Sequence, residues 1–116
     1  MSGNQRWWLS LRRRWPVRRF VVVEDSMRPG LVPGDGLLAM RGGTPKVGQL
    51  RVFRDPRGSS RYLVKRVGAV CRSATGTTFE ALSDNAAAPG VVDSRQFGWV
   101  PAADSYRVVL RVPAGR

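Results

Sequence analysis

The sequence contains no histidine and a single cysteine, Cys71, among its 116 residues. One cysteine cannot form an internal disulfide, and without histidine it leaves too few ligands for a typical zinc centre. The absence of histidine also excludes a Ser-His-Asp triad and every acid–base mechanism that uses an imidazole. We therefore expect neither a metal ion nor another cofactor, and any catalysis has to use other side chains.

Long apolar runs are also absent. No run approaches the roughly 20 residues that a helix needs to span a bilayer, and the N-terminus lacks the apolar core and small-residue cleavage site of a signal peptide. We therefore expect a protein without a transmembrane segment or signal peptide, located in the cytoplasm or peripherally at a membrane.

Acidic residues and lysines are both scarce. Eight Asp and Glu stand against 20 basic residues, of which only Lys46 and Lys65 are lysine, and the formal net charge is +12. Such a charge attracts nucleic acid or an anionic membrane. A general preference for arginine over lysine produces the same excess, so the charge alone does not identify a partner.

The first 20 residues combine six arginines with three tryptophans and no acid. Arginine beside tryptophan suits the headgroup region of a membrane and also suits stacking on nucleic acid. We predict a basic, Trp-rich tail over residues 1–20. Its residues 6–20 either contact an anionic membrane surface or form a poorly ordered extension.

From residue 21 onward, short β-rich runs alternate with turn-forming segments. The runs are RFVVVE, GLLAM, QLRVFR, RYLVKRVGAV, TTFEAL, FGWVP and YRVVLRV, separated by Gly, Pro, Asn, Asp or Ser. This spacing predicts one all-β domain over residues 21–116, a compact antiparallel barrel or sandwich. The region shows no useful stretch of helical period, nucleotide-binding motif or internal repeat.

Lys65 lies within an apolar run, RYLVKRVGAV. With a period of two, Leu63, Lys65 and Val67 share one face of the strand. If that face is inward, burial lowers the pKa of Lys65 and makes the neutral amine accessible near neutral pH, which arginine could not achieve. The alternative is a lysine at a strand edge, or one whose ammonium reaches solvent.

Ser26 lies in VVVEDSMRPG, where a strand runs into a turn. A serine there is a turn residue or a nucleophile. A neutral lysine can act as general base to a serine hydroxyl, one of the few serine mechanisms open to a chain without histidine. We expect Pro29 and Gly30 to turn the chain so that Ser26 stands exposed, while Met27 packs in the core.

Four blocks, in order from residue 21 to residue 101, resemble the type I signal peptidases, a family of serine–lysine peptidases. DSMRPGLVPGDGLLA resembles the nucleophile segment, KVGQLRVFRDP the next strand, YLVKRVGAV the strand with the base, and SDNAAAPGVVDSRQFGWVP the last block. The matching positions are Ser26, Met27, Pro29 and Asp35, then Lys65 and Arg66, then Asp84, Asn85, Asp93, Ser94, Arg95 and Gly98.

The resemblance implies a serine endopeptidase with the β fold of signal peptidase and LexA-like catalytic cores. Ser26 would attack the scissile carbonyl to form an acyl-enzyme, and neutral Lys65 would take its proton and later activate water. The backbone N–H of Ser26 would donate to the oxyanion, a kind of contact worth about 3 kcal/mol of barrier. Asp93 and Arg95, with Arg66, would form ion pairs behind the site.

The implied substrate is a bacterial precursor protein with small residues before the cleavage site, bound as an added β-strand. The chain resembles a minimal catalytic core, and compact members of the family include the nickel-type superoxide dismutase maturation proteases. The family often has a hydroxyl residue where this chain has Glu24, whose carboxylate must point away from an oxyanion or be protonated. Ser83 replaces a glycine, and residues 89–92 supply no hydroxyl to support the lysine.

Three other readings stay open. A LexA-type self-cleaving protein shares the Ser-Lys chemistry, but the chain has no Ala-Gly or Cys-Gly bond ahead of Ser26. A basic nucleic-acid-binding β module fits the charge but leaves Lys65 and the last block unexplained, so these features argue against a nucleic-acid partner. An inactive member of the peptidase family would accommodate Glu24.

Overall fold

A computed structural model describes residues 16–115. The strands of this region form one antiparallel sheet. The elements are β1 (Val17–Val21), β2 (Gly36–Arg41), β3 (Leu50–Arg54), β4 (Tyr62–Ser73), β5 (Gly76–Leu82), α2 (Ser94–Phe97), β6 (Val100–Pro101) and β7 (Tyr106–Val112). Each of the seven β-rich runs contributes a strand. The predicted all-β, antiparallel fold class is therefore confirmed.

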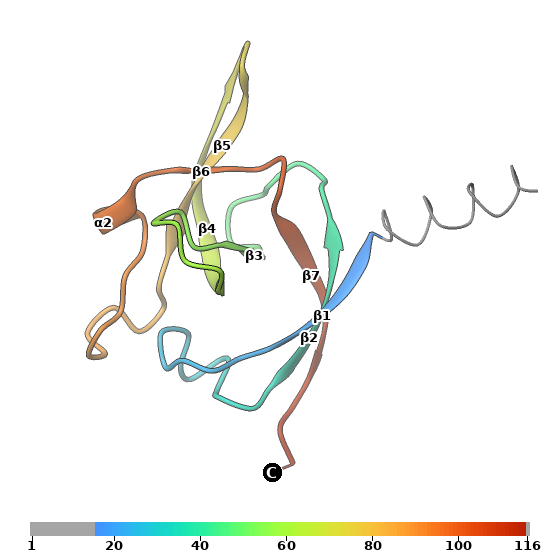
Figure 1. Cartoon of the computed structure of the whole chain (residues 1–116), viewed down its shortest axis with the longest axis vertical. Coiled ribbons are helices and arrows are strands. Elements are labelled where there is room, and N and C mark those ends of the chain that lie inside the picture. The colour runs from blue at the N-terminus through green and yellow to red at the C-terminus, as the bar shows by residue number, and fades with distance from the viewer. Residues whose placement is uncertain (1–15, 116) are drawn as a thin grey trace, which may run out of the picture.

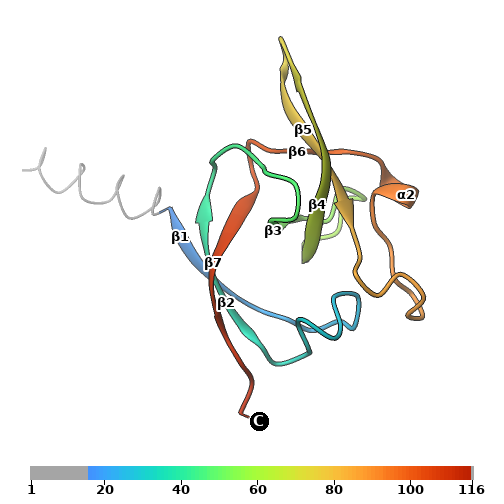
Figure 2. The same ribbon diagram turned by 180° about the vertical axis from the view of Figure 1, so that it is seen from behind.

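The strands are ordered β1-β2-β7-β3-β4-β5-β6, so β7 returns to the middle of the sheet. The edges, β1 and β6, are not paired with each other, and the sheet curls without closing into a barrel. Figure 1 shows β1, β2 and β7 together at the right of the molecule, while the β4–β5 hairpin projects from the top. Seen from behind in Figure 2, the turn after β1 reaches across to the chain that leads from β5 to α2.

Some boundaries differ from the predicted runs. β1 begins at Val17, so residues 17–20 of the predicted tail pair with β2; residues 1–15 lie outside the described part of the chain. The region expected to lack helix contains the single turn α2, because Asp93 and Gln96 form a reciprocal capping box. Within residues 16–115, no helix is long and apolar enough to cross a bilayer.

Two apolar clusters form the core. The first is Val22, Met27, Leu31, Leu37, Ala39, Val52 and Tyr106, and the second is Phe53, Leu63, Val67, Phe79, Ala81, Val100 and Ala102. Consecutive strand residues point to opposite faces, so Val52 of β3 enters the first cluster and Phe53 the second. β3 thus lies between the clusters and joins the two halves of the curled sheet.

Candidate active site

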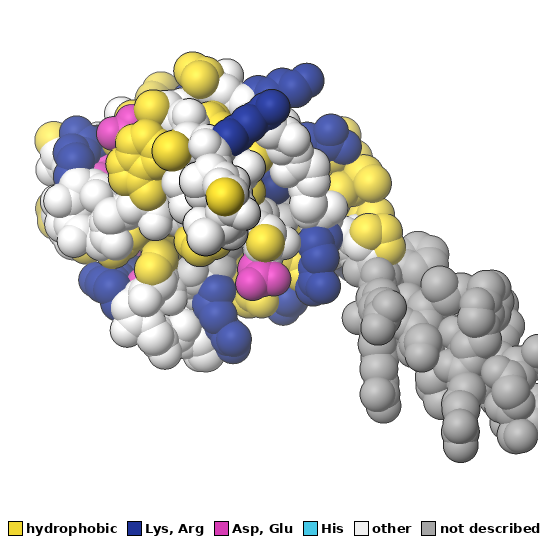
Figure 3. Space-filling model, turned by 90° about the horizontal axis from the view of Figure 1, so that it is seen from above, with side chains coloured by type: hydrophobic (Ala, Val, Ile, Leu, Met, Phe, Trp, Pro, Cys, Tyr) yellow, Lys and Arg dark blue, Asp and Glu magenta, His cyan; other side chains and the backbone are white. Residues whose placement is uncertain are grey.

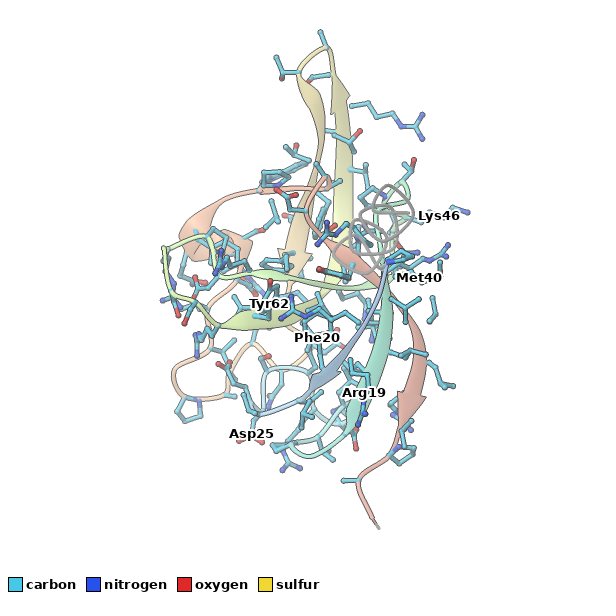
Figure 4. The ribbon with its side chains drawn as sticks, turned by 45° about the vertical axis from the view of Figure 1, so that its right-hand side comes forward. Arg19, Phe20, Asp25, Met40, Lys46 and Tyr62 are labelled. Atoms are coloured by element: carbon cyan, nitrogen blue, oxygen red, sulfur yellow. The ribbon has the colours of Figure 1, made fainter. Side chains whose placement is uncertain are left out.

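Ser26 and Lys65 line one small pocket of about 50 Å³. Its other walls are mainly apolar and come from β1, β2, β3, β4 and the residues after β1; they include Phe20, Val22, Leu37, Val52, Tyr62 and Leu63. The rings of Phe20 and Tyr62 have centroids 5.2 Å apart, and both residues are labelled in Figure 4. The sheet therefore brings the two candidate catalytic residues to the same cavity.

Lys65, the fourth residue of β4, is fully buried. Leu63 and Val67 are buried beside it, while Tyr62 and Val64 are only partly buried. The inward face is therefore the one that contains Lys65. Burial lowers the pKa of the Lys65 ammonium, and the nearby charges of Glu24 and Asp93 only partly oppose this shift.

Ser26 is only 3% exposed, so the expectation that it stands exposed is wrong. The turn is covered by residues that follow β5. The N–H of Asn85 donates to the Ser26 carbonyl at 2.8 Å, and its side-chain amide donates to the Asp25 carbonyl at 3.0 Å. The N–H of Asp84 also contacts Met27 Sδ at 3.4 Å, so the last block clamps the backbone around Ser26.

Ser83 is the residue that the sequence reasoning missed. Lys65 Nζ donates to Ser83 Oγ at 2.9 Å, and both residues are buried. Among the described residues, no hydrogen bond joins Lys65 Nζ to Ser26 Oγ. Lys65 pairs with no residue of β5, but Arg66 pairs with Leu82, so one further step along both strands brings Ser83 opposite Lys65.

Asp93 supports Ser83 from behind. Its carboxylate accepts the Ser83 N–H at 2.9 Å and binds the Arg95 guanidinium at 2.8 Å. Burial raises the pKa of the Asp93 carboxyl, but the hydrogen bonds from Arg95 and Ser83 outweigh that effect and hold its pKa well below the ordinary value. Asp93 also begins α2 as its N-cap. Lys65, Ser83 and Asp93 therefore form one connected chain of contacts.

Arg66 forms the second ion pair near the site. Its guanidinium binds Asp84 at 2.7 Å and the Gly48 carbonyl at 2.9 Å. Asp93 and Arg95 pair separately from Arg66 and Asp84. The expected pair of Asp93 with Arg95 is present, but Arg66 binds Asp84, a pair that was not predicted, and this contact fixes the loop that carries Asn85 to β4.

Ser94 and Gly98 shape α2 rather than the pocket. Ser94 Oγ accepts the Ala81 N–H at 2.7 Å, which attaches the helix to β5. Gly98 ends the helix with a φ of 85°, a conformation that glycine adopts without strain. Neither residue lines the pocket that contains Lys65.

The remaining predicted residues organise the turn after β1. Asp35 is fully buried and accepts the backbone N–H groups of Val32 at 3.0 Å and Ala114 at 2.8 Å. It therefore ties the turn to the C-terminal segment. Met27 is buried in the first core cluster, as expected, whereas Pro29 lies exposed on the turn.

Glu24 lines the pocket, and its carboxylate is bound by the Arg61 guanidinium. Arg61 also contacts the buried Asp55, whose Oδ2 atom is bound by both Arg57 and Arg61. The hydrogen bond from Arg57 is the largest of several contacts that hold the pKa of the Asp55 carboxyl well below its ordinary value. The Glu24 carboxylate beside the pocket is therefore paired with the Arg61 guanidinium, an ion pair that the sequence did not predict.

Within residues 16–115, no three His, Cys, Asp or Glu side chains come together as a metal site. A scan against models of protein families and a search of curated proteins found no match to this chain. Its function is therefore inferred from its own residues and their geometry.

Proposed function

We propose that this protein is a serine endopeptidase of the type I signal peptidase kind, which removes a leader from a precursor protein. The proposal rests on one observation. Lys65, which is fully buried, and Ser26, which is held in a turn, both line the same small pocket. A buried lysine with a lowered pKa is suited to proton transfer near neutral pH. A bacterial origin, and a location in the cytoplasm or peripherally at a membrane, belong to the same proposal.

In the acylation step, neutral Lys65 Nζ takes the proton of Ser26 Oγ while this oxygen bonds to the carbonyl carbon of the substrate. The new ammonium then protonates the leaving amine as the peptide C–N bond breaks, which leaves an ester on Ser26. A water molecule gives its proton to Lys65 and attacks the ester, and Ser26 Oγ leaves with that proton. Hydrogen bonds between catalytic groups often tighten only when substrate binds. We therefore expect Ser26 Oγ and Lys65 Nζ to come into direct contact in the complex with substrate.

The surroundings support the same chemistry. Asn85 fixes the carbonyl of Ser26, which orients the backbone whose N–H we assign to the oxyanion. Arg61 binds Glu24, so the negative charge of the Glu24 carboxylate is paired beside the pocket. The hydroxyl that supports Lys65 comes from Ser83.

The pocket also supports a substrate class. It is small and largely apolar, which fits a small side chain next to the cleaved bond. β1 is an edge strand of the sheet, and residues 21–24 at its end line the pocket. An extended peptide can add to such an edge and place alternate side chains into the pocket.

Single substitutions test this proposal. The chain has only two lysines, so Lys46 serves as the control for Lys65. Ser26→Ala and Lys65→Met should each lower cleavage of quenched peptides with alanine before the scissile bond by at least about a thousandfold. Ser60→Ala and Lys46→Met, which change exposed residues, should cleave as the wild type does. Cleavage is measured by mass spectrometry, after circular dichroism shows that each variant is folded.

Two results would contradict the peptidase proposal. Undiminished cleavage by Lys65→Met would remove the base from the mechanism. Cleavage confined to the protein's own chain, visible in its intact mass and lost in Ser26→Ala, would identify a self-cleaving protein instead.

A further inference from the structure

Glu24 places a carboxylate beside the residues proposed for catalysis. It lies two residues before Ser26, and it is the one acid among the described residues that line the candidate pocket. An unpaired negative charge at this position would oppose the proposed chemistry twice, because it would favour the ammonium form of Lys65 and repel an oxyanion. A cation held against Glu24 would remove both effects.

Arg61 is the cation that binds Glu24, and buried Asp55 holds it there. The Arg61 guanidinium contacts the Glu24 carboxylate through Nη1 and reaches Asp55 Oδ2 through Nε at 3.2 Å. The Asp55 N–H also donates to the Arg61 carbonyl at 2.9 Å, and Arg57 binds the Asp55 carboxylate at 2.8 Å. These contacts form a chain of alternating charges with no net charge, the rim network of Glu24, Arg61, Asp55 and Arg57.

The charges of the rim network act on Lys65 across the pocket. Burial is the largest influence on the pKa of Lys65 and lowers it. Glu24 raises this pKa, whereas Arg61 and Arg57 lower it, so the arginines oppose the effect of Glu24 on the amine. Loss of Arg61 would leave Glu24 without its partner beside Lys65, while Asp55 would keep its contact with Arg57.

The other titratable and charged groups that face Lys65 have partners outside the rim network. Arg51 faces Lys65 from β3 as its cross-strand partner, Asp93 from the start of α2, and Tyr62 from within the pocket. Their contacts are Arg51 with Ser105, Asp93 with Arg95 and Tyr62 with Arg18. A substitution of Arg61 leaves these contacts in place, so its effect on Lys65 comes through the rim network.

We propose that Arg61 is a positioning residue of the candidate active site, whose ion pair with Glu24 keeps Lys65 neutral and leaves no unpaired negative charge beside the oxyanion. Arg61 acts through Glu24 and Lys65 rather than on the substrate. The inference rests on the proposed function and deepens it, because it explains how the chain accommodates a carboxylate two residues before its nucleophile. Asp55 and Arg57 complete the arrangement by fixing Arg61 at the rim.

Peptide cleavage measured over a range of pH tests the proposal. Arg61→Gln should lower kcat/KM at pH 7 at least about tenfold, and the rise of kcat/KM with pH should move to higher pH, since unpaired Glu24 favours the ammonium of Lys65. The double variant Glu24→Gln, Arg61→Gln should recover most of the loss, because a neutral amide requires no cation. Equal losses in the single and double variants would overturn the proposal and show that Arg61 only supports the fold.

The control has to remove a positive charge from elsewhere, because basic side chains are widespread on the face of the molecule drawn in Figure 3. Arg54→Gln does so at the exposed end of β3, and Arg54 forms no ion pair within residues 16–115. It should keep the activity and pH profile of the wild type, and Arg61→Lys should retain more activity than Arg61→Gln. A shift in Arg54→Gln equal to that in Arg61→Gln would overturn the proposal.

A second measurement does not require activity. Protein labelled with ¹³C at the lysine Cε atoms gives NMR signals from only two lysines, and exposed Lys46 is an internal reference for Lys65. The titration midpoint of Lys65 should be higher in Arg61→Gln than in the wild type and should return in the double variant, while that of Lys46 stays constant. An unchanged Lys65 midpoint in folded Arg61→Gln overturns the inference. Failure of the proposed function differs, because the wild type would then cleave no peptide although the Lys65 midpoint shifts as expected.

Discussion

At the scale of single residues, the site depends on one lysine whose surroundings differ from those of a surface ammonium. Lys65 is enclosed in β4, and its hydrogen bond runs to a neutral hydroxyl rather than to a carboxylate. Desolvation therefore dominates its behaviour and lowers its pKa. Ser83 holds the amine in place without supplying a charge that would restore the pKa.

Ser83→Ala should lower kcat/KM for peptide cleavage about tenfold or more, because Lys65 loses the acceptor that orients it. Ser83→Thr keeps a hydroxyl and should recover part of the loss, while Ser60→Ala is the control. The measurement is peptide cleavage together with thermal unfolding. Full activity in Ser83→Ala, or equal damage by the threonine variant, would contradict a positioning role.

The lowered pKa of Lys65 also predicts how stability depends on pH. Between the lowered folded-state pKa and the ordinary value of 10.5, the unfolded chain binds a proton at Lys65 that the folded chain does not. The free energy of unfolding should therefore rise with pH in that window, and this rise should be missing from Lys65→Met. Urea unfolding at several pH values tests the difference, and parallel curves for the two proteins would contradict it.

At the scale of elements, the short segment from β5 to β6 organises the site from behind. Asp93 caps α2, binds Arg95 and accepts the Ser83 N–H. The loop before it supplies Asn85, which holds the turn at Ser26. The turn at Ser26 and the N-terminus of α2 are distant in sequence, and these contacts hold both of them next to Lys65 of β4.

Asp93→Ala should lower the free energy of unfolding by about 3 kcal/mol, because it removes a helix cap and leaves a buried N–H without its acceptor. Asp104→Ala, at an exposed acid between β6 and β7, is the control and should change stability little. Urea denaturation provides both values. A change within about 0.5 kcal/mol for Asp93→Ala would show that α2 is not held in this way.

The elements themselves were largely predictable, whereas their register was not. Alternation of apolar residues is local, so it located seven strands and grouped Lys65 with Leu63 and Val67 on one face of β4, without deciding whether that face is inward. The β4–β5 hairpin has a register shift between Val67 and Val70. A straight continuation of the pairing from Ser73 and Gly76 would place Asp84 opposite Lys65, and the shift places Ser83 there instead. Pairing across a bulge depends on contacts such as the Ala69 N–H to Glu80 Oε1 bond of 3.2 Å, which no local pattern encodes.

At the scale of the whole molecule, β3 connects two apolar clusters through consecutive residues, Val52 and Phe53. A buried guanidinium strengthens this junction, because Arg51 of β3 donates to Ser105 Oγ at 2.8 Å and to the Gly42 carbonyl at 2.7 Å. The candidate pocket is lined by residues of both clusters, such as Val52 and Leu63, and residues 83–95 between β5 and β6 hold it in place. The two halves of the curled sheet should therefore be stable only together.

Phe79→Ala should destabilise the protein by about 3–5 kcal/mol, since Phe79 is fully buried in the second cluster. If the halves unfold as one unit, hydrogen exchange should accelerate in β1 and β2 as well as in β4 and β5. Mass spectrometry of peptides from the four strands measures this. Acceleration restricted to β4 and β5 would show that the clusters unfold separately.

The sequence by itself determined the strands, the residues that share a face of β4 with Lys65, and the chemistry that a chain without histidine can use. These follow from residue identity and from periodicities of a few residues. Only the tertiary structure decided that Ser26 is buried, that Ser83 partners Lys65 and that Arg61 binds Glu24. Each of these depends on which distant segments meet, and that is set by strand order, register and a bulge.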